Sequence, residues 1–169
     1  NMSCVSGVAG DFDNDMDLDV SIVAGGMLSS GEPNVLYENS GACSAPLFDV
    51  TAKSGVGDIG ESFGSGWADY DNDGDLDVLV GRYGESGLVT AGIRPRAGFY
   101  KNTLSSDAHW LEVDLVERAK SLNTVGARLY VRAGGVIQTR TIYGAGTSFL
   151  TQLPYRQHFG LGDAETVDW

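Results

Sequence analysis

The sequence predicts an all-β chain built from antiparallel strands. Short apolar or alternating runs recur at steady spacing, each bounded by glycine, asparagine, aspartate or serine. No stretch keeps a 3.6-residue apolar period, so we expect little or no helix. The chain carries 24 glycines in 169 residues, roughly twice the average usage, and they follow no collagen-like period. Glycine at this level is typical of a chain with many tight turns.

An internal repeat organises the first hundred residues. The run DFDNDMDLD at residues 11–19 recurs as DYDNDGDLD at residues 69–77, and LYEN at 36–39 is answered by FYKN at 99–102. A unit of this length with about four strands is what a β-propeller blade needs, so we predict about two propeller-type blades. The predicted strands cover residues 5–10, 18–24, 34–39, 47–52, 63–69, 76–82, 98–102, 109–116, 126–133, 136–143 and 156–160.

The repeat stops near residue 104, and the composition then changes. Strands rich in β-branched residues and arginine follow a polar linker at Ser105–Ala108. We therefore divide the chain into residues 1–104, with two repeats, and residues 109–169, a small β-domain. The sequence begins almost directly at an acidic run and ends in an apparent strand. Repeat architectures usually need three or more units, so we expect a fragment, or blades supplied by another copy.

Charge is concentrated in the two acidic runs. They hold ten of the 23 acidic residues, and the chain has 11 basic ones and a formal net charge of −12. Neither nucleic acid nor an anionic membrane fits an acidic face, so we exclude both as partners. No apolar run approaches the ~18 residues that span a bilayer. The first residues also lack the basic and apolar segments of a signal peptide.

The alternating carboxylates predict a bound cation. Five aspartates so close together repel one another unless a cation lies among them, and hard oxygen ligands suit Ca²⁺ better than softer metals or Mg²⁺. An EF-hand needs a glutamate at the twelfth loop position, where this chain has Ile22 and Val80. The runs supply nearly all ligands themselves, which favours structural over catalytic metal. The candidate metal residues are Asp11, Asp13, Asp15, Asp17, Asp19, Asp69, Asp71, Asp73, Asp75 and Asp77.

The two acidic runs and the LYEN-type strands resemble FG-GAP/VCBS repeats, the blades of integrin-type propellers. Further on, the chain is similar to the ASPIC/UnbV domain of cartilage acidic proteins and bacterial relatives. This second resemblance rests on Asn123, Val125–Arg128, Gln138–Arg140, Gly146–Ser148, Gln152 and His158–Gly162. The family's domain continues past Trp169, so the resemblance implies a C-terminal module that is incomplete in this sequence.

The resemblance also assigns roles within each loop. Aspartates at positions 1, 3, 5 and 9 are the expected side-chain ligands, and the aspartate at position 7 gives its backbone carbonyl. Met16 stands where the family usually has glycine, as Gly74 does in the second loop. A left-handed backbone there costs a non-glycine residue about 1 kcal/mol, so we expect two Ca²⁺ sites, the first one weaker.

Other residues carry weaker hypotheses. Cys4 and Cys43 could form a disulfide or remain two thiols. His109 and His158 show no zinc-like spacing, and a structural hydrogen bond is the preferred role for His158. A group of aromatic residues could form a binding surface for sugar or protein, but core packing between blades is the preferred expectation. They are Trp67, Tyr70, Tyr83, Phe99, Tyr100 and Trp110. A partner contact is expected at the glycine-rich loop 84–98, with the nearby arginines Arg82, Arg94 and Arg96.

These observations together predict an extracellular or cell-surface calcium-binding interaction module without catalysis of its own. Its ligand would be a protein or a carbohydrate, with no nucleic acid and no membrane insertion. Exposed blade edges could pair two copies into a homo-oligomer. The alternative is a carbohydrate-active or other propeller enzyme in which Ca²⁺ organises the substrate cleft. A cleft with an unliganded carboxylate pair would favour that alternative.

Overall fold

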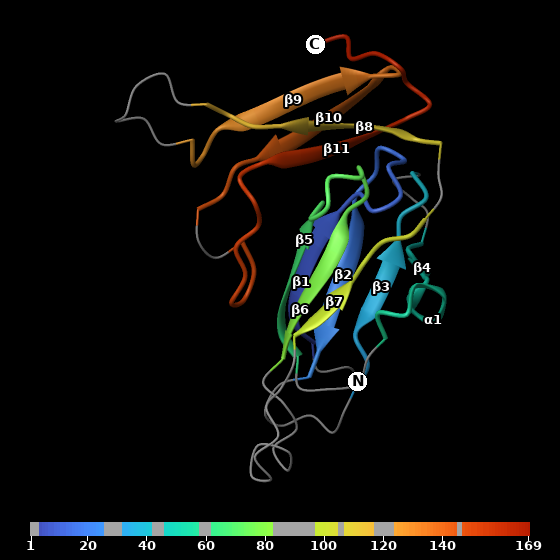
Figure 1. Cartoon of the computed structure of the whole chain (residues 1–169), viewed down its shortest axis with the longest axis vertical. Helices are drawn as coiled ribbons and strands as arrows, with labels where there is room; N and C mark the ends of the chain where they lie inside the picture. The colour runs from blue at the N-terminus through green and yellow to red at the C-terminus, as the bar shows by residue number, and fades with distance from the viewer. Residues whose placement is uncertain are drawn as a thin grey trace.

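The computed structural model describes residues 4–25, 32–41, 46–57, 62–82, 97–104, 107–116, 124–144 and 147–169. Strands and one short helix make up its regular structure (Figure 1). The elements are β1 (Cys4–Gly10), β2 (Asp19–Ala24), β3 (Val35–Glu38), β4 (Phe48–Asp49), α1 (Thr51–Ser54), β5 (Ser62–Ala68), β6 (Asp77–Arg82), β7 (Gly98–Tyr100), β8 (His109–Val113), β9 (Arg128–Ala133), β10 (Val136–Thr141) and β11 (Gln157–Gly162). Several predicted features lie outside the described residues: Cys43, Tyr83, Arg94, Arg96, Asn123, Gly146 and residues 105–106 of the linker.

The all-β prediction is confirmed, with one local correction. The predicted strand at 47–52 is wrong in its second half, because β4 ends at Asp49 and α1 begins at Thr51. The Asp49 carboxylate accepts a hydrogen bond from the Thr51 amide at 3.0 Å, a local turn that ends the strand. Gly55 then closes the helix in a left-handed conformation with φ of 75°.

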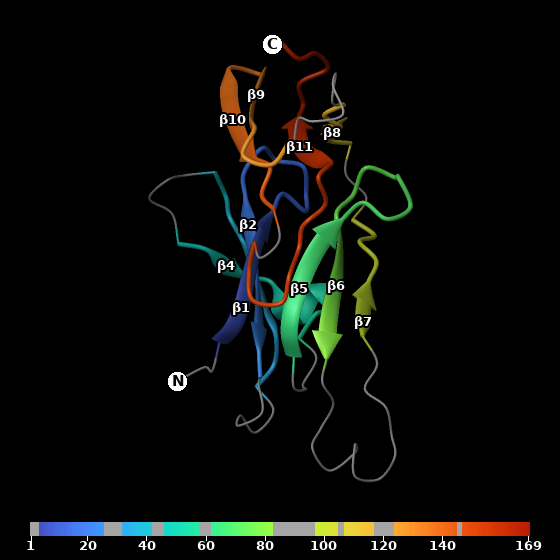
Figure 2. The same cartoon turned by 90° about the vertical axis from the view of Figure 1, so that its left-hand side faces the viewer.

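Two antiparallel sheets form the N-terminal part. The first has strand order β1-β2-β3-β4, and the second has order β5-β6-β7. In β1, Ser6, Val8 and Gly10 are buried at alternate positions, as expected of a strand with one covered face. β5 packs against β1 and β2, so the two sheets stand side by side with their strands roughly aligned (Figure 2).

Trp67 of β5 lies at the centre of the core between these sheets. Its side chain is 5% exposed and stacks on Phe12, with ring centroids 6.2 Å apart. A Cβ atom at Gly10 would lie 2.8 Å from the Trp67 ring, so glycine there lets the indole approach β1. The remaining buried members of this core are Val8, Val23, Leu36, Val56, Leu76, Val78 and Val80.

The C-terminal strands form two separate pairs, which lie across one end of the sheets (Figure 1). β9 and β10 are joined by Gly134 and Gly135, both with positive φ, as a tight two-residue hairpin requires. β8 pairs with β11. A second core lies between the two pairs and contains Val131, Ala133, Phe159 and Leu161.

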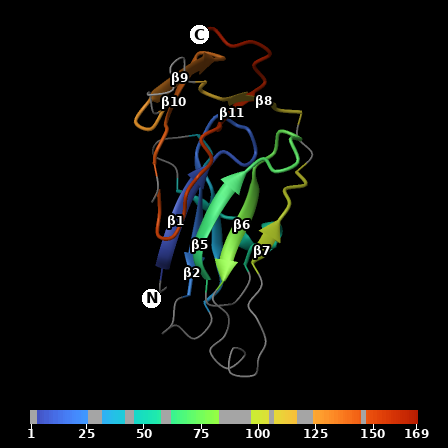
Figure 3. The same cartoon turned by 60° about the vertical axis from the view of Figure 1, so that its left-hand side comes forward.

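One C-terminal segment returns to the N-terminal sheets. Residues 147–153 run down beside β1 and β5 (Figure 3). The Ser148 hydroxyl lies 2.6 Å from that of Ser6 on β1, and the Phe149 ring contacts Phe63 on β5. Leu153 packs against the core around Trp67. This segment therefore fastens the two parts of the chain together along the strands β1 and β5.

Within the described residues, the structure contains no helix long and apolar enough to cross a membrane.

Candidate metal centre

The two acidic runs form loops of the same conformation. The first connects β1 to β2 and the second connects β5 to β6. In each loop the fourth and sixth residues have positive φ: Asn14 (63°) and Met16 (81°) in the first, Asn72 (59°) and Gly74 (94°) in the second. Asparagine and glycine adopt this backbone readily. The left-handed conformation expected at Met16 is therefore confirmed.

Met16 has a left-handed backbone conformation, which favours glycine, and the packing of its side chain explains why a methionine is found there. The side chain packs against the core of the C-terminal strand pairs. Its methyl group would lie 3.2 Å from a Cβ atom at Gly134 and 3.5 Å from one at Gly162. Burial of this flexible side chain offsets the backbone cost of about 1 kcal/mol. Met16 thus joins the first loop to the C-terminal strands, a role that the sequence alone did not reveal.

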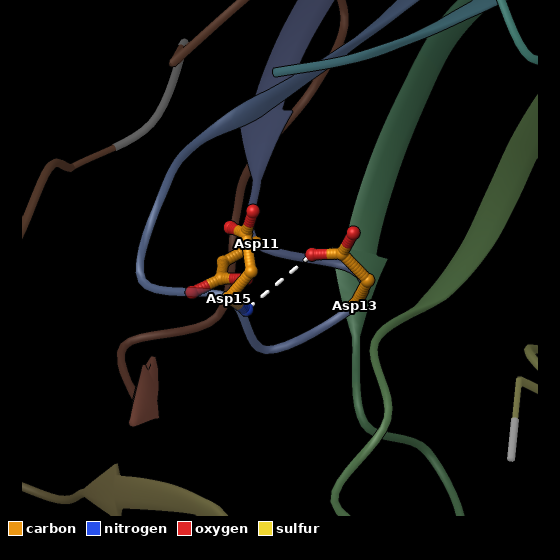
Figure 4. A group of neighbouring side chains, drawn as sticks. All are labelled: Asp11, Asp13 and Asp15. Atoms are coloured by element: carbon orange, nitrogen blue, oxygen red, sulfur yellow. Dashed lines mark hydrogen bonds between the residues drawn. The ribbon is translucent and has the colours of Figure 1, made fainter. Parts of the chain in front are cut away.

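The first loop brings together the carboxylates of Asp11, Asp13 and Asp15 (Figure 4), whose oxygens lie within 4.8 Å of one another. Asp11 is only 1% exposed. Its Oδ2 accepts hydrogen bonds from the amides of Met16 at 3.2 Å and Gly160 at 3.1 Å. Its Oδ1 is buried and has no hydrogen-bond partner among the described residues. A buried carboxylate oxygen without a partner is costly, and a cation would satisfy it.

Burial and mutual repulsion raise the pKa values of several carboxyl groups in this loop. Burial, with the charges of Asp15 and Asp13, raises the pKa of Asp11 to about 7. Burial and the charge of Asp15 raise the pKa of Asp13 to about 6, and Glu38 adds to this effect. Burial also raises the pKa of Asp19 to about 8. Without a cation, these carboxyl groups therefore keep their protons at higher pH than ordinary aspartates do. A bound positive charge would have the opposite effect and favour the carboxylate form.

In the second loop the oxygens of Asp69, Asp71 and Asp77 come together, which are the first, third and ninth positions, whereas the first loop clusters its first, third and fifth. Like the first cluster, this one has one buried, one half-buried and one exposed residue, here Asp77, Asp69 and Asp71. The ammonium group of Lys101 contacts the Asp71 carboxylate and lies 3.2 Å from Asp73 Oδ2. The two loops share a backbone conformation. Among the described residues, however, a positively charged side chain forms ion pairs only with the second loop.

The ninth aspartate of each loop anchors the following strand. Asp19 accepts the amides of Phe12 at 3.0 Å and Asn39 at 2.8 Å, one on each oxygen. Asp77 accepts the amides of Tyr70 at 3.2 Å and Asn102 at 2.8 Å in the same manner. These bonds satisfy both oxygens of each carboxylate. The backbone amide of the last residue in each LYEN-type motif thus closes its loop, while the asparagine side chains donate to the carbonyls of Leu18 at 3.4 Å and Phe12 at 2.7 Å.

The remaining predicted residues lie outside the two clusters or at their edges. The amide of Asp17 donates to Asp15 Oδ1 at 2.9 Å, and the amide of Asp75 donates to Asp73 Oδ1 at 3.1 Å. These contacts order the turn within each loop. The Asp75 carboxylate also accepts a 3.4 Å hydrogen bond from the side chain of Asn14.

Asn14 connects three parts of the chain, and the sequence did not single it out. Its amide nitrogen donates to the Gly74 carbonyl at 3.0 Å, which links the two loops. Its Oδ1 lies 2.6 Å from His158 Nε2, and its carbonyl accepts the Gly162 amide at 2.8 Å. The structural hydrogen bond expected of His158 is therefore present. Burial lowers the pKa of His158 to about 4, so the ring is neutral at pH 7.

A cavity of about 630 Å³ opens between the sheets and the C-terminal strands, beside both loops. Asp11, Asp69 and Glu112 line it, together with Arg140 and Arg156. Glu112 is paired with Arg156 at 3.0 Å, and Asp69 accepts the Gly74 amide at 2.8 Å. Neighbouring groups thus hold Glu112 and Asp69, whereas Asp11 keeps one oxygen without a hydrogen-bond partner among the described residues.

The expectation that the aromatic residues fill the core is only partly met. Trp67 is buried and Tyr100 packs against its cluster, but Tyr70, Phe99 and Trp110 are 62%, 48% and 40% exposed. Phe99 faces outward because it pairs with Leu79, whose side chain is also exposed. Tyr70 contacts Phe99 edge to face, with centroids 4.8 Å apart.

The raised pKa values give a pH prediction for the cation-free protein. The folded state holds protons on Asp11, Asp13 and Asp19 that the unfolded state has released, so stability falls as pH rises. We expect the melting temperature in EDTA to fall between pH 6.5 and 8.5, most clearly above about pH 7.5, where His158, with its ordinary pKa of 6.5, is neutral in the unfolded state as well. Thermal melts across this range test it. A flat profile would contradict the prediction, and D13N should show a shallower fall than the unaltered chain.

Comparison with known proteins gives a match for the C-terminal part. Residues 117–169 match the family model of ASPIC and UnbV. This range contains β9, β10 and β11. His158 and Gly160, which contact the first loop, both lie on β11. A search of curated proteins found no match.

Proposed function

We propose that the protein is a calcium-binding interaction module in which Ca²⁺ has a structural role in the acidic loops. The observation that carries this proposal is the buried Asp11 carboxylate, whose Oδ1 lacks a hydrogen-bond partner among the described residues. It lies beside the carboxylates of Asp13 and Asp15. Three hard oxygen donors of this kind fit Ca²⁺. When bound, the ion would neutralise carboxylates that otherwise repel one another.

The surroundings of the first loop favour a structural role for the ion. Asp11 binds the Gly160 amide, and Asn14 contacts His158, so the loop supports the C-terminal strands directly. Cation binding that orders this loop would also stabilise the contact between the two parts of the chain. Because the unfolded chain has no preformed site, the binding free energy adds to the free energy of unfolding.

An exposed apolar patch supports the interaction role. Leu79 and Phe99 pair on the exposed face of β6 and β7, and Tyr70 of the second loop contacts Phe99; each is about half exposed or more. Exposed aromatic clusters are typical of protein and carbohydrate contacts. We propose an FG-GAP/VCBS-type repeat identity for the N-terminal part and an extracellular or cell-surface location. Millimolar Ca²⁺ in that location fills sites of moderate affinity.

The carbohydrate-active alternative has less support. It requires a carboxylate pair free to exchange protons with a substrate. Three carboxylates line the cavity beside the loops, those of Asp11, Asp69 and Glu112. Arg156 pairs with Glu112, the Gly74 amide donates to Asp69, and Asp11 is the proposed cation ligand.

The proposal is tested by thermal melts with and without EDTA. At a Ca²⁺ concentration 100 times the dissociation constant, binding stabilises the folded state by about 2.7 kcal/mol. We expect EDTA to lower the melting temperature by about 5–10 °C, and Ca²⁺ to restore it far better than Mg²⁺.

Two variants make the test specific. D13N removes a loop carboxylate and should reduce the effect of EDTA, whereas D107N changes an exposed aspartate outside the loops and should leave it unchanged. A melting temperature that does not respond to EDTA in the unaltered chain would refute the calcium proposal.

A further inference from the structure

The two acidic loops differ in one neighbouring residue, at a position that is equivalent in both. Asn39 and Asn102 each donate their amide to the ninth aspartate of their loop at 2.8 Å. The residue just before each asparagine therefore occupies the same place relative to its loop. That residue is Glu38 beside the first loop and Lys101 beside the second. The repeat thus carries opposite charges at matching sites.

The positive charge of Lys101 lies against the carboxylates of the second loop. Its ammonium contacts the Asp71 carboxylate and lies 3.2 Å from Asp73 Oδ2. A divalent ion entering this loop would have to displace the ammonium from Asp71 and would remain close to a like charge. Both effects lower the affinity of the second loop for a cation.

Glu38 has the opposite effect on the first loop. It is half-buried and lines a cavity of about 310 Å³ between the two sheets, together with Asp13, Lys53 and Lys101. Its charge adds to burial and to the charge of Asp15 in raising the pKa of Asp13. A fourth carboxylate beside Asp11, Asp13 and Asp15 increases the attraction for a divalent ion. Arg140 acts on Asp11 through its charge, but among the described residues no cation forms an ion pair with the first loop, and the buried Oδ1 of Asp11 has no hydrogen-bond partner.

We propose that the first loop is the tight divalent-cation site, and that Lys101 partly replaces the metal in the second loop. This inference rests on the proposed calcium binding and adds an order of affinity. It reverses the order expected from Met16, because the charge at the position before the asparagine outweighs the backbone cost. The structure already offsets that cost by packing Met16 against the C-terminal core.

Isothermal titration of the full chain with Ca²⁺ tests the inference. We expect one tight and one weak site. D13N should abolish the tight site, and D71N should leave it intact. K101M should strengthen the weak site by about tenfold or more, since a positive charge close to the ion is removed. E38Q should weaken the tight site. R132M is the matched control, because Arg132 is an exposed cation on β9 that pairs with Asp168 and lies outside both loops.

The outcomes separate this inference from the proposed function. Two sites of equal affinity, loss of the tight site in D71N, or no change in K101M would each overturn the inference while leaving calcium binding in place. No Ca²⁺ binding by the unaltered chain would overturn both. Circular dichroism of each variant checks that the strands are retained, so that a lost site is not mistaken for a lost fold.

Discussion

Replacing Trp67 by alanine is expected to destabilise the protein by about 3–5 kcal/mol, because a large buried side chain is removed and a cavity remains. The indole is 5% exposed, stacks on Phe12 and lies against the glycine backbone of β1 at Gly10. Its Nε1 also donates to the Val8 carbonyl at 3.5 Å. The side chain therefore joins the two sheets, and its loss affects both.

The measurement is the free energy of unfolding in urea, or a melting temperature lowered by about 6–20 °C. W110A provides the matched control. Trp110 is 40% exposed and stacks on His158 at the other end of the sheets, so its loss should cost less than half as much. Equal losses in the two variants would contradict a core centred on Trp67.

Strand positions could be predicted from the sequence because they depend on local alternation. Ser6, Val8 and Gly10 alternate inward along β1 whatever the strand pairs with. The structure of the segment after Asp49 was harder to predict, because the turn depends on a hydrogen bond from the Thr51 amide to the carboxylate of Asp49. Composition does not distinguish such a turn from a continued strand.

The acidic clusters were also visible in the sequence, since alternate aspartates in a tight loop converge without help from the rest of the fold. Their environment was not visible. Asn14 lies among aspartates and looks like an ordinary turn residue, yet its side chain connects the second loop to His158. Lys101 is 30 residues from Asp71 and meets it only because β6 and β7 are paired. Contacts of this kind depend on tertiary packing, which periodicity does not encode.

The exposed aromatic residues show a further limit. Phe99 occupies an alternating strand position, which is equally compatible with the inner and the outer face of a sheet. The register decides between them: Phe99 pairs with the exposed Leu79, whereas the neighbouring Val78 and Val80 are buried. Knowledge of the strand alone therefore could not assign Phe99 to the surface.

Gly160 offers the most direct test of how the C-terminal strands contact the first loop. A Cβ atom at this position would lie 2.5 Å from Asn14 Cα and 2.6 Å from the Asn14 carbonyl carbon, and it would also meet Asp11 Oδ2. Backbone atoms cannot move aside as a flexible side chain can, so G160A must push β11 away from the loop. The buried hydrogen bond from the Gly160 amide to Asp11 would be lost with the contact.

We expect G160A to destabilise the protein by about 2–5 kcal/mol, combining overpacking with a lost buried hydrogen bond. Urea unfolding measures the stability, and Ca²⁺ titration measures the accompanying loss of affinity at the first loop. G66A is the control, because a Cβ atom at Gly66 meets nothing closer than 3.9 Å. If G160A were as stable as G66A, β11 could not rest on Asp11 and Asn14 in solution. A loss of stability with unchanged Ca²⁺ affinity would instead show that the strand contact and the cation site act independently.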